Sequence, residues 1–218
     1  MQPSLAQVLS TLAHEIRTPL AVSQGYLKLY VDGRLTTPDD QHRALQKTRE
    51  ALGVIATLCA DMSRVSALSE TPAPALAARI DAAALVQELI AASELSGAAW
   101  IGERAAGASI ATNAPRDLAR AIIVLIKSAF DEAKDAPHAI ALHGDQNSLV
   151  LLAGAERTVH ALQAGPGSDT TKAVDVIHGG KGLTLICAAF VLQQHQVETW
   201  TLQDHRASVG FRVPLVTV

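Results

Sequence analysis

The segment LAQVLSTLAHEIRTPL, residues 5–20, decides how this chain begins to fold. Its large apolar side chains recur at intervals of four, three and four residues, at Leu5, Leu9, Leu12 and Ile16. This spacing places them on one face of an α-helix, as in the seam of a helical bundle. We therefore predict a long helix from about Gln2 to Tyr30.

A second helix is expected from about Pro38 to Ser69. Gly33 and Pro38 interrupt the first pattern, and Thr37 suits the N-cap position of the next helix. The apolar repeat of the second helix comprises Leu45, Thr48, Leu52, Ile55, Cys59 and Met62. Two such helices cannot bury both seams alone, so we expect residues 1–70 to form an antiparallel hairpin that pairs with a second copy in a dimeric four-helix bundle. The alternative is a hairpin docked on the rest of its own chain.

The run HEIRTPL, residues 14–20, carries the chemistry of this helix. A neutral imidazole on an exposed helix face can attack a phosphoryl group when a carboxylate holds its other ring nitrogen. Glu15 is the adjacent carboxylate. Thr18 lies one turn after His14, where its hydroxyl can orient a water molecule for the reverse hydrolysis. Pro19 should bend the helix just beyond the reactive turn.

With this run the chain resembles the histidine kinase family, whose members join a dimerisation and histidine-phosphotransfer domain to an ATP-binding domain. The resemblance implies a HisKA-type domain at residues 1–70, a linker at 71–75 and a degenerate ATPase-like domain at 76–218. It also implies that a response-regulator receiver docks on Arg17, Leu20 and Tyr26. The fold class expected from it is α+β, with the helical bundle followed by an α/β sandwich similar to the Bergerat domain of histidine kinases.

The pattern of the second half suits such a sandwich, with helices on one face of a sheet. Helices are expected at about 82–96, 115–134 and 182–194; strands are expected near 100–104, 109–112, 139–143, 148–153, 197–202 and 208–214. An irregular stretch should span about 154–182, and residues 164–169 are either a remnant of the family's ATP lid or a surface loop.

The nucleotide-binding residues that the family would place in this domain are eroded. Ser128 stands where the resemblance implies a magnesium-binding asparagine, and serine is the weaker ligand. Ala153 stands where it implies the aspartate that accepts a hydrogen bond from adenine, and of the two glycines expected next only Gly154 remains. A buried adenine amino group without its acceptor costs about 1 to 3 kcal/mol.

The last glycine-rich box, GGKGLTLI at residues 179–186, is partly preserved. Gly180 and Gly182 precede a helix, a geometry that suits a phosphate group, but Thr184 replaces a family glycine. The spacing of a P-loop is absent. Residual phosphate binding and a purely structural loop both remain open.

Composition and charge exclude some of the remaining classes of protein function. A formal net charge of −3 argues against a nucleic-acid-binding protein. No apolar stretch has the length of a membrane span. We expect both Cys59 and Cys187 to be buried thiols in a reducing compartment, which suits the cytoplasm. The histidines show no spacing that indicates a metal site.

These features together predict a phosphorelay protein. His14 would accept and donate a phosphoryl group with receiver aspartates, without ATP-driven autophosphorylation, and the receiver would supply the Mg²⁺. No tightly bound cofactor is expected. The alternatives are a divergent but active ATP-dependent kinase that still holds Mg-ATP, a receiver phosphatase that uses Glu15 and Thr18, and a non-catalytic pseudokinase scaffold.

Overall fold

The structure is a computed structural model of the 218-residue chain. It describes residues 5–70, 79–102, 108–112, 114–133, 135–144, 147–163, 165, 170–171, 182–202 and 205–216. The expected linker at 71–75 and most of the expected lid segment at 164–169 lie outside these ranges.

The chain divides into two compact units. The first comprises Met1–Leu68 together with His178–Cys187, and the second comprises Ser69–Ile177 and Ala188–Val218. Helix α6 (Gly182–Gln194) therefore contributes its first residues to the first unit and the others to the second.

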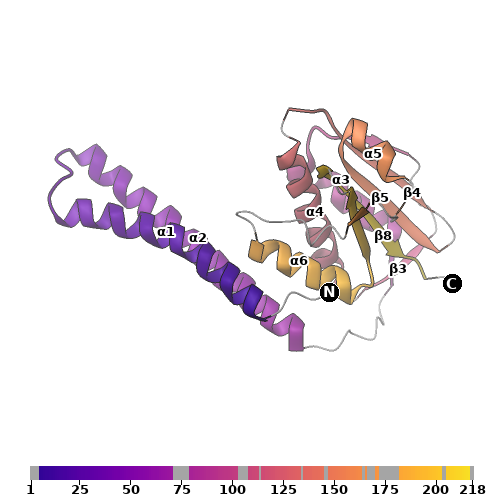
Figure 1. Ribbon diagram of the computed structural model, residues 1–218, viewed down its shortest axis with the longest axis horizontal. Coiled ribbons are helices and arrows are strands. Elements are labelled where there is room, and N and C mark those ends of the chain that lie inside the picture. The colour runs from indigo at the N-terminus through magenta and orange to yellow at the C-terminus, as the bar shows by residue number, and fades with distance from the viewer. Residues whose placement is uncertain are drawn as a thin grey trace. The chain divides into compact units, whose positions relative to one another are not determined.

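The first unit is built on a helical hairpin of α1 (Leu5–Val31) and α2 (Pro38–Glu70), which lie side by side in Figure 1. The predicted N-cap of α2 is confirmed: the Thr37 hydroxyl accepts a hydrogen bond from the Asp40 N–H at 3.1 Å and donates one to the Asp40 carboxylate at 2.7 Å. These bonds satisfy an N–H group that the first turn of a helix leaves unpaired. Helix α1 continues through Pro19.

The hairpin buries a short row of residues, most of them small. The buried positions are Val8, Ser23, Ala44, Thr48, Ala51, Leu58 and Asp61. Leu45 and Leu52, expected in the seam of α2, are instead 47% and 51% exposed, and Cys59 is exposed as well. Thr48 of the expected seam is buried as predicted, but the residues buried beside it are Ala44, Ala51 and Leu58, each one position earlier than expected. The prediction of a buried Cys59 is therefore wrong. Leu45, Leu52 and Cys59 form an outer stripe of α2.

The second unit contains short helices and two sheets. Its helical elements are α3 (Ala82–Ala91), the 3₁₀ turn η1 (Ser93–Leu95), α4 (Pro115–Glu132), α5 (Glu156–Leu162) and the end of α6. Its strands are β1 (Arg79–Asp81), β2 (Ala99–Ile101), β3 (Ser109–Ala111), β4 (His138–Gly144), β5 (Ser148–Ala155), β6 (Thr170–Thr171), β7 (Glu198–Leu202) and β8 (His205–Pro214).

The main sheet has the order β2-β4-β5-β8-β7-β6. Strands β2 and β4 are parallel, and every other pair in this sheet is antiparallel. Strands β1 and β3 pair separately as a two-stranded antiparallel sheet. The helices, the mixed sheet and the hairpin together confirm the predicted α+β class.

Helices cover both faces of the main sheet, which differs from the expected single helical face. Side chains on successive residues of a strand point to opposite faces. Val150 and Leu152 of β5 pack with Val159 and Leu162 of α5. Helix α4, which packs on β5 and β8, must cover the alternate face. Strand β5 is accordingly buried at every position. Helix α5 was missed because its seven residues directly follow a strand within an alanine-rich stretch that has no start signal.

Candidate functional site

His14 lies on the exposed surface of α1, with Thr18 also exposed four residues later. Four residues correspond to about one turn of an α-helix, so the hydroxyl and the imidazole lie on the same side of α1. Within the described part of the chain, the His14 ring makes no hydrogen bond. An exposed, unoccupied imidazole is open to a phosphoryl donor.

Glu15 is half-buried, and its carboxylate contacts the start of α6 within the first unit. One oxygen accepts a hydrogen bond from the Gly182 N–H at 2.5 Å, and the other accepts a longer one from the Leu183 N–H at 3.4 Å. Adjacent residues of a helix do not face each other. The structure therefore brings Glu15 together with Gly182, and an orienting role of Glu15 on the His14 ring stays a prediction.

A second contact ties the same segment to α2. The Thr184 hydroxyl donates a hydrogen bond of 3.0 Å to the Asp61 carboxylate, and the Cys187 thiol donates one of 3.2 Å to the Asp61 carbonyl. Asp61 and Cys187 are 8% and 7% exposed, which confirms the buried thiol predicted at Cys187. Sequence reasoning missed Asp61 because its partners lie more than a hundred residues away.

The three residues assigned to receiver docking are not gathered on one side of α1. Arg17 and Leu20 are exposed, whereas Tyr26 is half-buried. Nine residues separate Arg17 from Tyr26, which is about two and a half helical turns and puts them on opposite sides. Arg17 lies about 60° round the helix from His14, whereas Leu20 and Tyr26 each lie about 120° from it, in opposite directions. The docking surface stays a prediction for all three.

Two of the five residues expected at the nucleotide site, Ala153 and Gly154, are packed within the sheet. Ala153 is fully buried on the sheet face that α4 covers. Gly154 has φ +155°, and a Cβ atom there would come within 2.5 Å of the Ala207 carbonyl oxygen and 2.8 Å of the Ser208 Cα. The missing side chain of Gly154 thus lets β8 approach β5. Ser128 is half-buried on α4, and Gly180 lies outside the described residues.

Directly after β5, the chain leaves the region of Ala153 and Gly154. The Glu156 N–H donates a hydrogen bond to the Pro137 carbonyl, and α5 begins at once. Because Val159 and Leu162 pack on the face opposite α4, the residues after Ala155 are led away from the face on which Ala153 lies.

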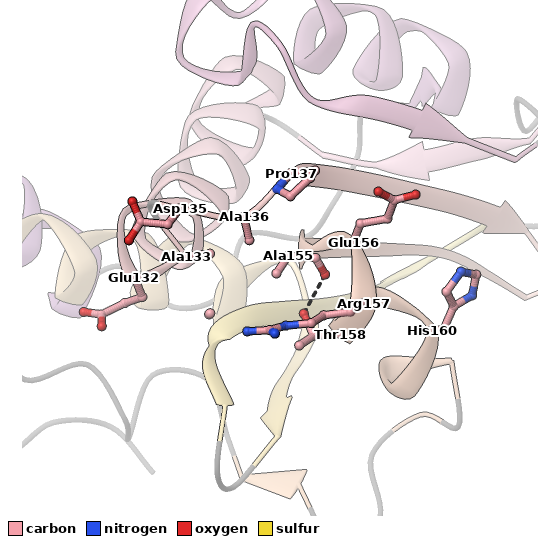
Figure 2. Close-up of a pocket in the computed structure, with 11 residues that line it drawn as sticks. Glu132, Ala133, Asp135, Ala136, Pro137, Ala155, Glu156, Arg157, Thr158 and His160 are labelled. Carbon is pink, nitrogen blue, oxygen red and sulfur yellow. Dashed lines mark hydrogen bonds between the residues drawn. The ribbon is translucent and has the colours of Figure 1, made fainter.

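An open pocket of about 790 Å³ lies where the α4–β4 connection meets the start of α5. Figure 2 shows Glu132 and Asp135 at one side of it and Glu156 and His160 at the other, with Arg157 between them. The Thr158 hydroxyl donates to the Ala155 carbonyl. The lining includes neither Ser128 nor Gly154, and its charged side chains are exposed. The pocket is thus distinct from the expected nucleotide residues.

No metal or membrane-spanning feature occurs in the described ranges. No group of three or more His, Cys, Asp or Glu side chains converges there as a metal site would require. Within the same ranges, no helix combines the length and the apolar character that crossing a bilayer requires.

Comparison with known proteins supports the assignment of the first helices. Residues 4–70 match the family described as His Kinase A (phospho-acceptor) domain. The comparison with curated proteins gave no match.

Among solved structures, the histidine kinase AdeS of Acinetobacter baumannii has a TM-score of 0.62 at 17% identity, over 94% of this chain and 98% of that one. A histidine kinase of Burkholderia phymatum has a TM-score of 0.41 at 16% identity, over 95% and 99% of the two chains. A bacterial phosphotransferase has a TM-score of 0.38 at 12% identity, over 97% and 98%. Residues 4–70 are therefore a His Kinase A (phospho-acceptor) domain, a two-component signalling domain of the histidine kinase type, in a chain that has the histidine kinase fold.

Proposed function

We propose that this chain is a histidine phosphotransferase of a phosphorelay, in which His14 exchanges a phosphoryl group with receiver aspartates and does not take one from ATP. The observation that carries the proposal is a contrast within one chain. His14 is exposed in a phospho-acceptor domain, whereas Ala153 is fully buried and β8 closes over Gly154. The nucleophile is accessible, while two residues expected at the adenine site are used in the packing of the sheet.

The proposed reaction needs only an activated donor. A ring nitrogen of neutral His14 attacks the phosphorus of an aspartyl phosphate; the new P–N bond forms as the P–O bond breaks, and the receiver aspartate leaves as a carboxylate. The receiver supplies the Mg²⁺ that neutralises the phosphoryl oxygens. A second receiver aspartate then attacks the phosphohistidine, and the imidazole leaves. No tightly bound cofactor of this chain takes part.

The first experiment offers the purified protein two phosphoryl donors, a ³²P-labelled phosphoreceiver and Mg-ATP labelled at the γ-phosphate. Acid-labile, base-stable label should appear from the receiver and not from ATP. His14→Ala should abolish it, and the matched control His42→Ala, on the exposed surface of α2, should retain it. Label from ATP that requires His14 would instead identify a divergent kinase. No label from either donor would leave the scaffold reading.

Receiver phosphatase activity is the second candidate, because Thr18 is exposed one turn from His14. Its hydroxyl can position a water molecule for attack on an aspartyl phosphate docked beside the ring. Thr18→Ala should then slow the loss of label from the receiver while leaving transfer to His14 intact. Equal hydrolysis by Thr18→Ala and the unmodified protein would remove this candidate.

The proposed assembly is a homodimer through the outer stripe of α2. Leu45, Leu52 and Cys59 are separated by seven residues each and expose an apolar row that the hairpin itself does not cover. Leu9 and Leu27 of α1 are 47% and 42% exposed. A second copy would bury these side chains in a four-helix bundle.

Sedimentation velocity tests this assembly with a matched pair of substitutions. Leu52→Glu should convert the dimer to a monomer by placing a charge in the bundle core. Val54→Glu should leave the dimer intact, because Val54 is equally exposed at 51% but lies off the outer stripe. Dissociation by both variants, or by neither, would contradict the proposed interface. The proposed receiver partner supports a cytoplasmic location, as do Cys59 and Cys187, neither of which is in a disulfide.

A further inference from the structure

The outer face of α4 carries a row of cations. The exposed positions of this helix are Arg116, Arg120, Lys127 and its last residue, Glu132. At about 100° per residue, Arg116 and Arg120 lie about 40° apart around the helix axis, and Lys127 lies between them. The three cations extend along about 16 Å of the helix. We call Arg116, Arg120 and Lys127 the basic stripe.

Within the residues that the structure describes, the basic stripe has no counter-charge. None of its three side chains makes an ion pair or a hydrogen bond there. Other arginines of the second unit lie among carboxylates. Arg212 of β8 pairs with Glu198 at 2.6 Å, and Arg157 lines the pocket next to Glu156. The cations of the basic stripe therefore keep their charge available to a partner.

The placement of these charges works against the helix that carries them. Arg116 lies in the first turn of α4, where the helix dipole favours an anion and disfavours a cation. Arg120 follows four residues later, and like charges at this spacing repel each other. No ion pair among the described residues offsets either effect. A local choice that the stability of the helix does not explain indicates a role in binding.

The shape of the basic stripe suits one kind of partner. Ile123 is half-buried between Arg120 and Lys127 along the helix, so the cations surround an apolar centre, as in a protein interface. The stripe is one helix wide, which fits a second helix better than the plane of a lipid bilayer. The net charge of −3 on the whole chain also disfavours the approach of a nucleic acid.

We propose that the basic stripe is a docking surface for an acidic helix of a partner protein. Carboxylates of that helix pair with Arg116, Arg120 and Lys127, and an apolar residue between them contacts Ile123. Exposed ion pairs contribute little each, so the complex is weak and salt-dependent, and electrostatic attraction mainly speeds its formation. The inference does not depend on phosphotransfer at His14.

Two synthetic alanine-rich helical peptides of identical composition test the proposal on the ¹⁵N-labelled full chain. One peptide gathers its glutamates on one helix face around a leucine, and the other distributes them around the helix. The one-face peptide should shift the amide resonances of α4 at several-fold lower concentration, and added salt should weaken its binding. Equal affinity for the two peptides, shifts confined to other elements, or no shifts at all would overturn the proposal.

Substitutions in the basic stripe separate binding from folding. Arg116→Gln, Arg120→Gln and Lys127→Gln should each weaken binding of the one-face peptide about two- to fivefold, the loss expected for one exposed ion pair. Arg79→Gln is the matched control, an exposed cation on β1 that should bind like the unmodified chain. The urea midpoint of Arg120→Gln should stay the same or rise, because a repulsion is removed. A lower midpoint would show that the charge serves the fold and would contradict the binding role.

Other polyanions provide the final comparison. Vesicles that contain phosphatidylserine and a short DNA duplex should leave the α4 resonances unchanged at the salt concentration at which the one-face peptide binds. Stronger binding of vesicles or of DNA, lost in the variants of the basic stripe, would replace the acidic helix as the occupant and overturn the proposal.

Discussion

Replacing Gly154 by alanine should destabilise the second unit, because its Cβ would meet backbone rather than movable side chains. The Ala207 carbonyl oxygen and the Ser208 Cα lie 2.5 and 2.8 Å from that position, both on the paired segment of β8. Backbone atoms of a paired strand cannot rotate away, so β5 and β8 must separate. Overpacking of this kind costs about 1 to 3 kcal/mol, in addition to the cost of a positive φ for alanine.

Gly97→Ala is the matched control, because Gly97 has φ +89° and nothing lies within 4 Å of its Cβ position. It should show the cost of the positive φ alone. Both tryptophans, Trp100 and Trp200, lie in the second unit, so their fluorescence during urea unfolding follows this unit. With a typical slope of about 1 to 3 kcal/mol per molar urea, Gly154→Ala should unfold about 1 M below Gly97→Ala.

Equal urea midpoints for the two variants would refute this reasoning. In that case the space beside Gly154 would be open, β8 would not close it, and the glycine would again be free for the close approach of a nucleotide base. A much lower midpoint for Gly154→Ala identifies the glycine as a packing residue of the sheet and strengthens the case against ATP as the phosphoryl donor.

Three further substitutions test the packing that positions the site. Thr37→Ala should lower the stability of the hairpin by about 1 kcal/mol through loss of the α2 cap, while Thr36→Ala should change it little, as followed by circular dichroism at 222 nm. Thr112→Val leaves the buried His195 Nε2 without its 2.7 Å partner and should cost about 1 to 3 kcal/mol in urea unfolding; Thr112→Ser should restore most of it. Gly53→Ala should stabilise α2 by about 0.5 to 1 kcal/mol, because its Cβ enters open space, and a loss of stability would reveal an unseen contact.

The long helices could be predicted from sequence because their signals are local and repeated. The seven-residue periodicity of α2 holds over many turns, and the Thr37 cap marks its start. Periodicity cannot decide which of two adjacent stripes the hairpin buries. The row of Leu45, Leu52 and Cys59 and the row of Ala44, Ala51 and Leu58 both repeat every seven residues. The structure buries Ala44 and leaves Leu45 exposed.

The features missed from the sequence depend on partners that are distant along the chain. The two-sided burial of β5 arises from its pairing with β8 and from α5, whose apolar residues give too short a pattern to recognise. The contact between Glu15 and Gly182 spans 167 residues. Each of the two residues was singled out by its own motif, but nothing in either motif indicates the other.

In the proposed reaction, the chemistry of an acyl phosphate removes the need for a nucleotide site on this chain. An aspartyl phosphate brings its own activation and its own Mg²⁺, so the acceptor chain must offer an accessible imidazole and a docking surface but no pocket for a base. Ala153 and Gly154 are then free to be used for packing, and they are: one is fully buried and the other lets two strands meet. A side chain at residue 154 would meet the Ala207 carbonyl and Ser208, so this position cannot change without moving β8. Under the proposed function, restoring asparagine at residue 128 and aspartate at residue 153 should therefore not by itself create a kinase.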